Sequence, residues 1–189
     1  MSWLIGLVSL LSLRVLKLEN NIFKVLDEVC QPTRATKYSA MVDLYARESV
    51  VIGAGETKIV PLGVKIDRCS IKDSLEDWEH IGGFMESHYL ELHPRSSLRA
   101  KGLIVGVGVI DLDYPDELGL IVHNPLRFES VMNFMRMERG QKALRDFDIS
   151  YTINKGDKIA QCTLMEHKGY LLGIESDAER SGGFGSTGM

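Results

Sequence analysis

Two hydroxyl side chains and a guanidinium group stand together at the start of the segment 94–114. The segment opens with residues 94–97, which read PRSS. A turn of that composition presents backbone N–H groups, the Ser96 and Ser97 hydroxyls and the Arg95 side chain, all of which donate hydrogen bonds to anions. The turn therefore predicts a binding site for phosphate or carboxylate oxygens.

A candidate general base stands at the other end of the same segment. Asp111 and Asp113 lie beside Tyr114, directly after the apolar residues 103–110. A carboxylate in this position can activate water, and the neighbouring ring can pack against a flat or cyclic ligand. The apolar residues include Gly108 and predict a hairpin whose backbone a ligand can approach closely. A buried hairpin with polar ends explains this stretch equally well.

The elements that must position these groups are short and rich in β-forming residues. At 189 residues, with 44% hydrophobic and 25% charged residues, the chain is typical of one globular domain. Strands are predicted within residues 43–45, 49–66, 88–93, 115–124 and 150–167. The segment 49–66 is expected to form a hairpin around a Gly-Ala-Gly-Glu turn. The fold class predicted is all-β, a jelly-roll-like barrel or sandwich with a short helical insertion.

Two longer segments interrupt this pattern. Residues 69–87 are acidic and turn-rich, and we expect an extended surface loop with one short helix around 73–80. Their charges favour a solvated surface over a metal site. Residues 125–148 predict a helical excursion, which either packs as a flap or offers a methionine-rich face to a protein partner.

Composition also limits the compartment and the partners. A net charge of -4 argues against a nucleic-acid partner. The apolar run 3–13 is too short to span a bilayer and no basic residue precedes it, so neither a membrane anchor nor a cleaved signal is expected. Cys30, Cys69 and Cys162 are odd in number and widely spaced. They predict a reducing compartment, which is the cytoplasm, or the host cytoplasm if the chain is viral.

The end of the chain, residues 179–189, is rich in Gly and Ser. Such a segment has too little apolar surface to order itself and is expected to become ordered on an anionic ligand. Arg180, Ser186 and Thr187 supply a cation and two hydroxyls, and Phe184 supplies a ring. The expected organisation is a β domain, 1–178, followed by a flexible substrate-closing arm, 179–189.

Five segments in order resemble the five motifs of the trimeric dUTPases, the enzymes that hydrolyse dUTP to dUMP and pyrophosphate. PRSSLRAKG (94–102) and GVIDLDY (108–114) are similar to the second and third motifs. DLYA (43–46) resembles the end of the first, and GDKIAQ (156–161) the fourth, with Lys158 in place of the commoner arginine. GGFGSTG (182–188) matches the fifth. Motifs in this order and number are a specific signal.

The resemblance implies a role for each matched residue. Asp111 is expected to be catalytic and to activate the water that attacks the α-phosphorus. Tyr114 is expected to pack on the deoxyribose and exclude a ribose 2′-OH, and Phe184 to cover the uracil. Contacts with the substrate are implied for Asp43, Arg95, Ser96, Ser97, Gly108, Tyr114, Gly119, Gln161, Arg180, Phe184, Gly185, Ser186 and Thr187.

The resemblance also implies a cofactor and an assembly. Mg²⁺ is expected, held chiefly by the triphosphate itself with no direct protein ligand, while Asp43 contacts it through water. The assembly implied is a homotrimer whose active sites each draw residues from all three chains. The biological role implied is to limit uracil in DNA and to supply dUMP.

Two other functions remain open at the level of sequence. A dCTP deaminase has a similar fold and Arg-Ser-Ser turn, but it typically reads Ile-Asp-Pro-Gly-Phe where this chain has IDLDY (110–114), and it lacks the GGFGSTG tail. A dUTP-binding regulatory protein on the same scaffold could use the two insertions for a protein partner. Retention of Asp111, Tyr114 and the tail favours the hydrolase.

Overall fold

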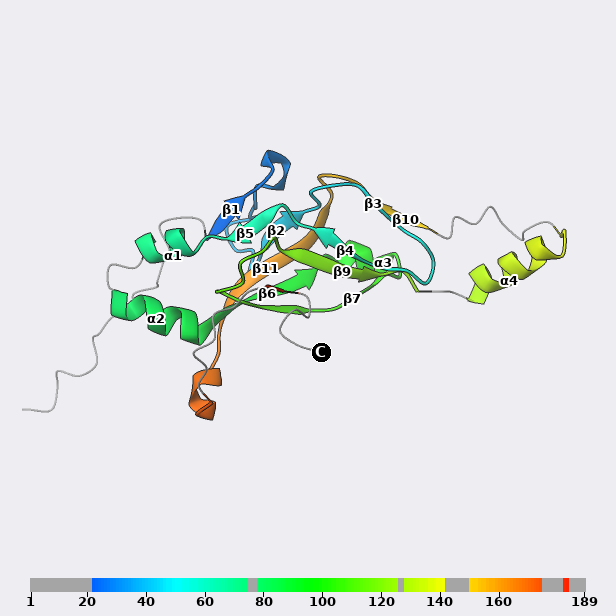
Figure 1. Ribbon diagram of the computed structural model, residues 1–189. Coiled ribbons are helices and arrows are strands. Elements are labelled where there is room, and N and C mark those ends of the chain that lie inside the picture. Colours follow the sequence, from blue (N-terminus) through cyan, green and yellow to red (C-terminus); the bar gives the residue numbers. More distant parts are fainter. Residues whose placement is uncertain (1–21, 75–77, 126–127, 142–149, 175–181, 184–189) are drawn as a thin grey trace, which may run out of the picture.

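Antiparallel β-strands form the body of the protein, which is described by a computed structural model (Figure 1). The structure describes residues 22–74, 78–125, 128–141, 150–174 and 182–183. The strands are β1 (Phe23–Val25), β2 (Val42–Tyr45), β3 (Val50–Ile52), β4 (Thr57–Pro61), β5 (Val64–Ile66), β6 (His88–Pro94), β7 (Ile104–Val105), β8 (Gly108–Asp111), β9 (Gly119–His123), β10 (Tyr151–Ile153) and β11 (Lys158–Glu166).

The strands are arranged in small sheets around one core. The largest has the order β2-β11-β6-β8, a three-stranded sheet has the order β4-β9-β7, and β1-β5 and β10-β3 form two-stranded sheets. Strand β6 shows why these residues form a sheet, because Leu90 and Leu92 point into the core while Tyr89, Glu91 and His93 alternate onto the other face. Fully buried side chains from different sheets meet in the core, among them Leu44, Ile52, Leu62, Leu90, Leu120, Ile153 and Ile159. The prediction of an all-β fold is confirmed.

The two predicted hairpins are wrong in their pairing. Strands β3 and β4 do not pair with each other: β3 pairs with β10 and β4 with β9. In the same way β7 pairs with β9, whereas β8 pairs with β6. The apolar alternation identified the strands correctly, but it carries no information about which distant strand lies alongside. The segment 103–111 therefore joins two sheets, with Gly106 between them.

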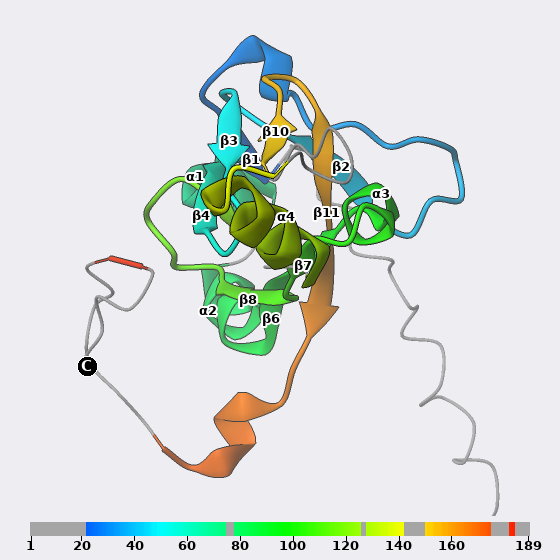
Figure 2. The same cartoon turned by 90° about the vertical axis from the view of Figure 1, so that its right-hand side faces the viewer.

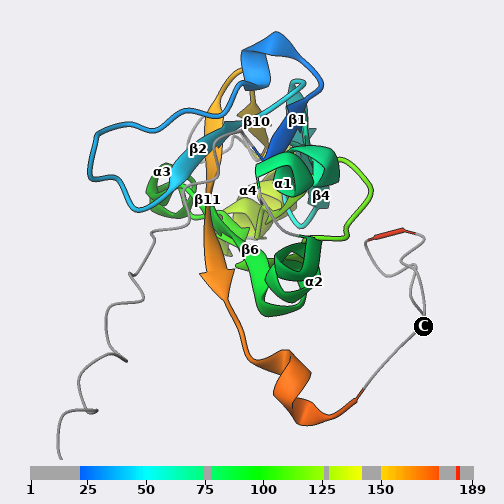
Figure 3. The same cartoon turned by 90° about the vertical axis from the view of Figure 1, so that its left-hand side faces the viewer.

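Helices stand at both ends of the molecule. The segment 69–87, expected to be mainly an extended loop, instead forms two helices, α1 (Arg68–Ser74) and α2 (Trp78–Ser87). They lie together at one end (Figure 3), and α4 (Phe128–Glu138) lies at the other, beyond β3 and β10 (Figures 1 and 2). The predicted helical excursion in 125–148 is confirmed by α4. The remaining helical turns are η1 (Glu28–Cys30), α3 (Ser96–Ala100) and η2 (Gly169–Leu172).

Candidate functional site

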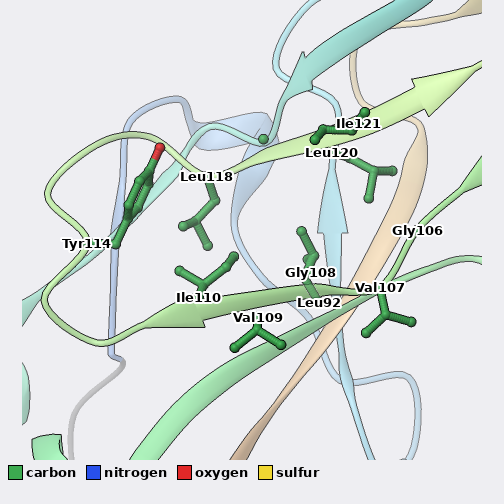
Figure 4. A pocket seen from close by; sticks show the side chains of 11 residues that line it. Leu92, Gly106, Val107, Gly108, Val109, Ile110, Tyr114, Leu118, Leu120 and Ile121 are labelled. Atoms are coloured by element: carbon green, nitrogen blue, oxygen red, sulfur yellow. The ribbon is translucent and has the colours of Figure 1, made fainter. Parts of the chain in front are cut away.

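An apolar pocket of about 250 Å³ opens between β8 and β9 (Figure 4). Gly108 lies in its wall and adds no side chain there; a Cβ built at this position would stand 3.5 Å from the Cβ of Leu92. Gly119 lines the pocket from the facing strand. The lining residues are Leu92, Gly106, Val107, Gly108, Val109, Ile110, Tyr114, Leu118, Gly119, Leu120 and Ile121. A pocket with apolar walls and exposed backbone groups suits a flat heterocycle and its sugar.

Tyr114 closes one end of this pocket, and Asp111 directly follows the lining residue Ile110. The Tyr114 ring is 6% exposed and forms the end wall (Figure 4). A tight turn connects the two residues, because the Tyr114 N–H donates to the Asp111 carbonyl at 3.1 Å. The Asp111 side chain is exposed at the end of β8. The structure thus brings together the predicted base, the predicted sugar-packing ring, Gly108 and Gly119.

The described part of the arm reaches the same ring. Gly182 is buried, and Gly183 lies against Tyr114 of the same chain so closely that an added Cβ would be 2.6 Å from the Tyr114 Cζ. Four of the sequence-predicted residues of the arm, Phe184, Gly185, Ser186 and Thr187, lie outside the described residues, as does Arg180. The same holds for the N-terminal run 3–13.

A second group of predicted residues surrounds a buried carboxylate on the same large sheet. Asp43 is 3% exposed, and its Oδ1 pairs with the Arg95 guanidinium while its Oδ2 accepts from Lys158 Nζ at 3.3 Å. The hydrogen bond to Asp43 raises the pKa of Lys158, and a further bond to Tyr45 adds to the shift. Two cations therefore balance a carboxylate that would otherwise be costly to bury.

Phosphate-binding candidates adjoin this carboxylate. Gln161 stands opposite Asp43 in the β11–β2 register. The Arg95 N–H donates to Ile159 O at 2.9 Å and so fixes the chain just before α3. Ser96 and Ser97 begin α3 with their side chains exposed. The arrangement presents a guanidinium, an amide and two hydroxyls around one surface, which is the donor set that phosphate oxygens require.

The two groups lie far apart within one chain. In the order β2-β11-β6-β8, Asp43 is level with His93, and Asp111 is level with Tyr89, which comes four residues earlier on β6. Three strand spacings of ~4.8 Å and four residues of ~3.4 Å place the Cα atoms of Asp43 and Asp111 roughly 20 Å apart. One chain therefore holds two half-sites: the pocket half-site (Gly108, Asp111, Tyr114, Gly119) and the phosphate half-site (Asp43, Arg95, Ser96, Ser97, Gln161).

The sequence analysis missed two features of these half-sites. Lys158 was noted as a replacement within a motif, but its pairing with Asp43 depends on the register of β11 against β2. A polar strip on β6 was missed as well, in which Tyr89 Oη donates to Glu91 Oε2 at 2.9 Å and His93 Nε2 contacts Glu91 Oε1. The period-two spacing of residues 89, 91 and 93 was the available signal for the strip.

Comparison with known proteins decides the family. A model of the dUTPase family matches residues 84–130. The deoxyuridine 5'-triphosphate nucleotidohydrolase of Lactococcus lactis subsp. lactis is 34% identical over 169 residues, covering 83% of this chain and 87% of that protein. The chain belongs to the dUTPase family. The residues matched by the dUTPase family model include PRSSLRAKG (94–102) and GVIDLDY (108–114).

Solved dUTPase structures agree in fold. The dUTPase of phage phi11 of S. aureus, described with a species-specific insert, aligns with a TM-score of 0.54 at 22% identity and covers 87% of this chain and 97% of that one. A mutant of the phi11 dUTPase, described with a coordinated structural Mg(II) ion, aligns with a TM-score of 0.53 at 21% identity, covering 86% and 96%. These likenesses confirm the dUTPase fold of this chain.

Among the described residues, no three His, Cys, Asp or Glu side chains gather closely enough to hold a metal ion. No helix in the described part of the chain is long and apolar enough to cross a membrane.

Proposed function

We propose that the protein hydrolyses dUTP to dUMP and pyrophosphate, with Asp111 activating the water that attacks the α-phosphorus. The observation that carries the proposal is the pocket half-site, in which an apolar slot lined by Gly108 and Gly119 ends at Tyr114, and the exposed Asp111 follows the lining residue Ile110. The reaction limits uracil in DNA and supplies dUMP.

The pocket supports recognition of a deoxyuridine. Gly108 lines the slot and carries no side chain, so the polar edge of a uracil ring can approach its backbone closely. Gly119 offers backbone from the opposite strand. Tyr114 is buried and fixed by its turn to Asp111, so it excludes a ribose 2′-OH by occupying its space.

The phosphate half-site supports binding of the triphosphate. Arg95, Ser96, Ser97 and Gln161 are proposed to hold the phosphate oxygens, and Arg180, Phe184, Gly185, Ser186 and Thr187 to complete the site from the arm. Both oxygens of Asp43 are engaged by Arg95 and Lys158, which suits contact with a hydrated Mg²⁺ rather than direct ligation. When bound, Mg²⁺ supplies charge neutralisation on the triphosphate.

The distance between the half-sites supports a shared site in a homotrimer. The α-phosphorus that Asp111 must serve and the oxygens that Arg95 and Gln161 hold belong to one triphosphate, only a few bonds apart. Half-sites roughly 20 Å apart in one chain cannot both reach it. The pocket half-site of one chain is therefore proposed to meet the phosphate half-site of a neighbour.

An exposed apolar face supports the same assembly. On the sheet β4-β9-β7, Ile59 and Ile121 are cross-strand partners that are 47% and 50% exposed, and Ile104, at 60%, lies diagonally beside them. Adjacent exposed isoleucines on one sheet face favour burial against another protein surface. A second copy of this chain is the proposed partner.

The proposed compartment is the cytoplasm. Cys30, Cys69 and Cys162 are all free thiols in the structure, and two of them are buried. This supports a reducing environment.

Pyrophosphate release tests the function. With Mg²⁺ present, the protein is expected to release pyrophosphate from dUTP but not from dCTP or dTTP, and the Asp111→Asn variant is expected to lose this activity. Release of ammonia from dCTP would instead establish a deaminase. Tight dUTP binding with no turnover by the wild-type protein would establish the regulatory alternative.

A further inference from the structure

Glu117 lies in the short connection that joins two walls of the pocket. The connection, residues 115–118, follows Tyr114 at one end of the pocket and leads directly into Gly119 on the facing strand. Leu118, its last residue, also lines the pocket and is 1% exposed (Figure 4). A shift of these four residues therefore moves a wall of the pocket with them.

Both carboxylate oxygens of Glu117 are engaged by residues outside this connection. Its Oε1 accepts a hydrogen bond from the Gly63 N–H at 2.7 Å, and its Oε2 lies 2.7 Å from Nη1 of Arg47. The Glu117 side chain is 22% exposed, whereas that of Arg47 is 43% exposed. Because water screens an exposed ion pair, the bond to the Gly63 N–H is the stronger of the two contacts.

Gly63 is a firm point of attachment. Its φ is 64°, and a Cβ added there would stand 2.6 Å from the Cβ of Cys30, so the position requires glycine on both counts. The Gly63 carbonyl accepts a hydrogen bond from the Leu26 N–H at 2.8 Å. The N–H that Glu117 binds therefore belongs to a backbone segment with little freedom to move.

Backbone hydrogen bonds hold only the end of the connection. The Leu62 N–H donates to the Leu118 carbonyl, and the Leu118 N–H donates to the Val64 carbonyl, each at 2.9 Å. Residues 115–116 are exposed. The Glu117 side chain thus adds its bond at the place where the exposed part of the connection meets the buried part.

We propose that Glu117 is a positioning residue, which holds residues 115–118 against Gly63 so that the pocket keeps its shape for a nucleoside. This inference rests on the proposed function and names a residue on which the same site depends for binding deoxyuridine. Glu117 acts through Leu118 and Gly119, which line the pocket, and not by contact with the nucleotide. Without its bond the connection occupies several positions, and the apparent affinity falls to the fraction of molecules in which the pocket is formed.

Separate ligands for the two half-sites test the proposal by binding, without need of turnover. Calorimetry measures the dissociation constants of dUMP, which needs the pocket, and of inorganic pyrophosphate with Mg²⁺, which needs only the phosphate half-site. For Glu117→Ala, dUMP is expected to bind about tenfold more weakly, because a lost hydrogen bond to a charged group costs about tenfold or more in an equilibrium constant. The pyrophosphate affinity is expected to stay within about twofold of wild type. Glu117→Gln, whose amide oxygen still accepts from Gly63, should bind dUMP within about threefold of wild type.

The matched control is Asp27→Ala. Asp27 has the same two kinds of contact, since its Oδ1 accepts from the Val29 N–H at 3.2 Å and its Oδ2 lies 2.6 Å from Lys155 Nζ, but it does not line the pocket. Both affinities of this variant are expected within about twofold of wild type. If Glu117→Ala does not fold, Glu117→Asp takes its place, because the shorter side chain draws the carboxylate away from Gly63 and should weaken dUMP by more than about threefold.

Three results would overturn the proposal: an unchanged dUMP affinity in the Ala or Asp variant of Glu117, equal losses for dUMP and pyrophosphate, or an equal loss for dUMP in Asp27→Ala. A wild-type protein that binds dUMP but releases no pyrophosphate from dUTP would refute the proposed hydrolysis and leave this inference intact. A wild-type protein that does not bind dUMP would refute the assignment of the pocket and this inference with it.

Discussion

The role of Asp43 depends on the two cationic side chains that pair with it. Its carboxylate is 3% exposed and lies between the guanidinium of Arg95 and the ammonium of Lys158. Removing one cation leaves a buried charge with only half of its compensation. Arg95 would then be held more strongly by Asp43 and would be less available to a phosphate.

Lys158→Met is therefore expected to raise the KM for dUTP by about tenfold with a smaller change in kcat, because binding of the phosphates is weakened more than the chemistry. Lys158→Arg keeps the charge and is the matched control, for which KM within about twofold of wild type is expected. Steady-state kinetics of pyrophosphate release measure both. Equal kinetics of the Met and Arg variants would show that the charge at position 158 has no part in phosphate binding.

Asp111→Asn isolates the proposed general base. The amide has nearly the size of the carboxylate but cannot accept the proton of water at neutral pH, so turnover is expected to fall about a hundredfold or more. Binding of α,β-imido-dUTP, measured by calorimetry, should be nearly unchanged. Turnover within about threefold of wild type would remove Asp111 from this role and direct attention to Asp113.

The sequence predicted the strands more accurately than the helices. The period-two alternation of residues 88–93 and the turn at Gly156 predicted β6 and the β10–β11 connection correctly. The partners of β3 and β4 were not predictable from local sequence. Strand β10 lies about 100 residues after β3 and strand β9 about 60 residues after β4, and no local residue selects either partner. The acidic segment 69–87 was misjudged since its charges are equally compatible with a solvated helix.

The candidate site was foreseen to the extent that its residues belong to motifs. Asp111, Tyr114 and Gly108 come together through a turn and one strand, which the local sequence determines. The contacts of Asp43 with Lys158 and Arg95 join β2, β11 and the residue that follows β6, which are distant in sequence, so only the strand register reveals them.

The polar strip on β6 carries a pH dependence of stability. The hydrogen bond from His93, followed by the one from Tyr89, lowers the pKa of Glu91 below its usual range. A carboxyl whose pKa is lowered by folding stabilises the protein above its unfolded-state pKa, and this contribution is lost as pH falls through the lowered pKa. Glu91→Gln is thus expected to lower the Tm at about pH 7, with the difference from wild type shrinking toward about pH 3.

Thermal unfolding followed by circular dichroism at several pH values measures this difference. Glu48→Gln, at an exposed position just before β3, serves as the control and is expected to have little effect on Tm throughout the range. A difference between Glu91→Gln and wild type that is the same at all pH values would show that the strip contributes through packing and not through the charge of Glu91.

At the scale of the whole molecule, the separation of the two half-sites requires that a shared active site combine residues from different chains. The pocket half-site and the phosphate half-site occupy opposite corners of the sheet β2-β11-β6-β8. If the site is shared between chains as proposed, neither half-site hydrolyses a nucleotide alone, and a chain with one damaged half-site still contributes its other half to a neighbour. Subunits damaged in different halves should complement each other only if an active site draws its halves from different chains.

Hybrid trimers of Asp111→Asn and Gln161→Ala subunits test whether an active site is shared between chains. Each variant alone is expected to have little activity. In trimers assembled at random from equal amounts, a site needs an intact Asp111 from one chain and an intact Gln161 from its neighbour, so roughly a quarter of the sites recover both. Pyrophosphate release by hybrids, formed by unfolding and refolding the mixture and verified by two different tags, should therefore approach about a quarter of the wild-type rate.

The same variants mixed after folding are the control, since intact homotrimers cannot exchange halves. Verified hybrids that stay as inactive as this control would show that Asp111 and Gln161 serve a site within one chain, and the shared site would have to be abandoned.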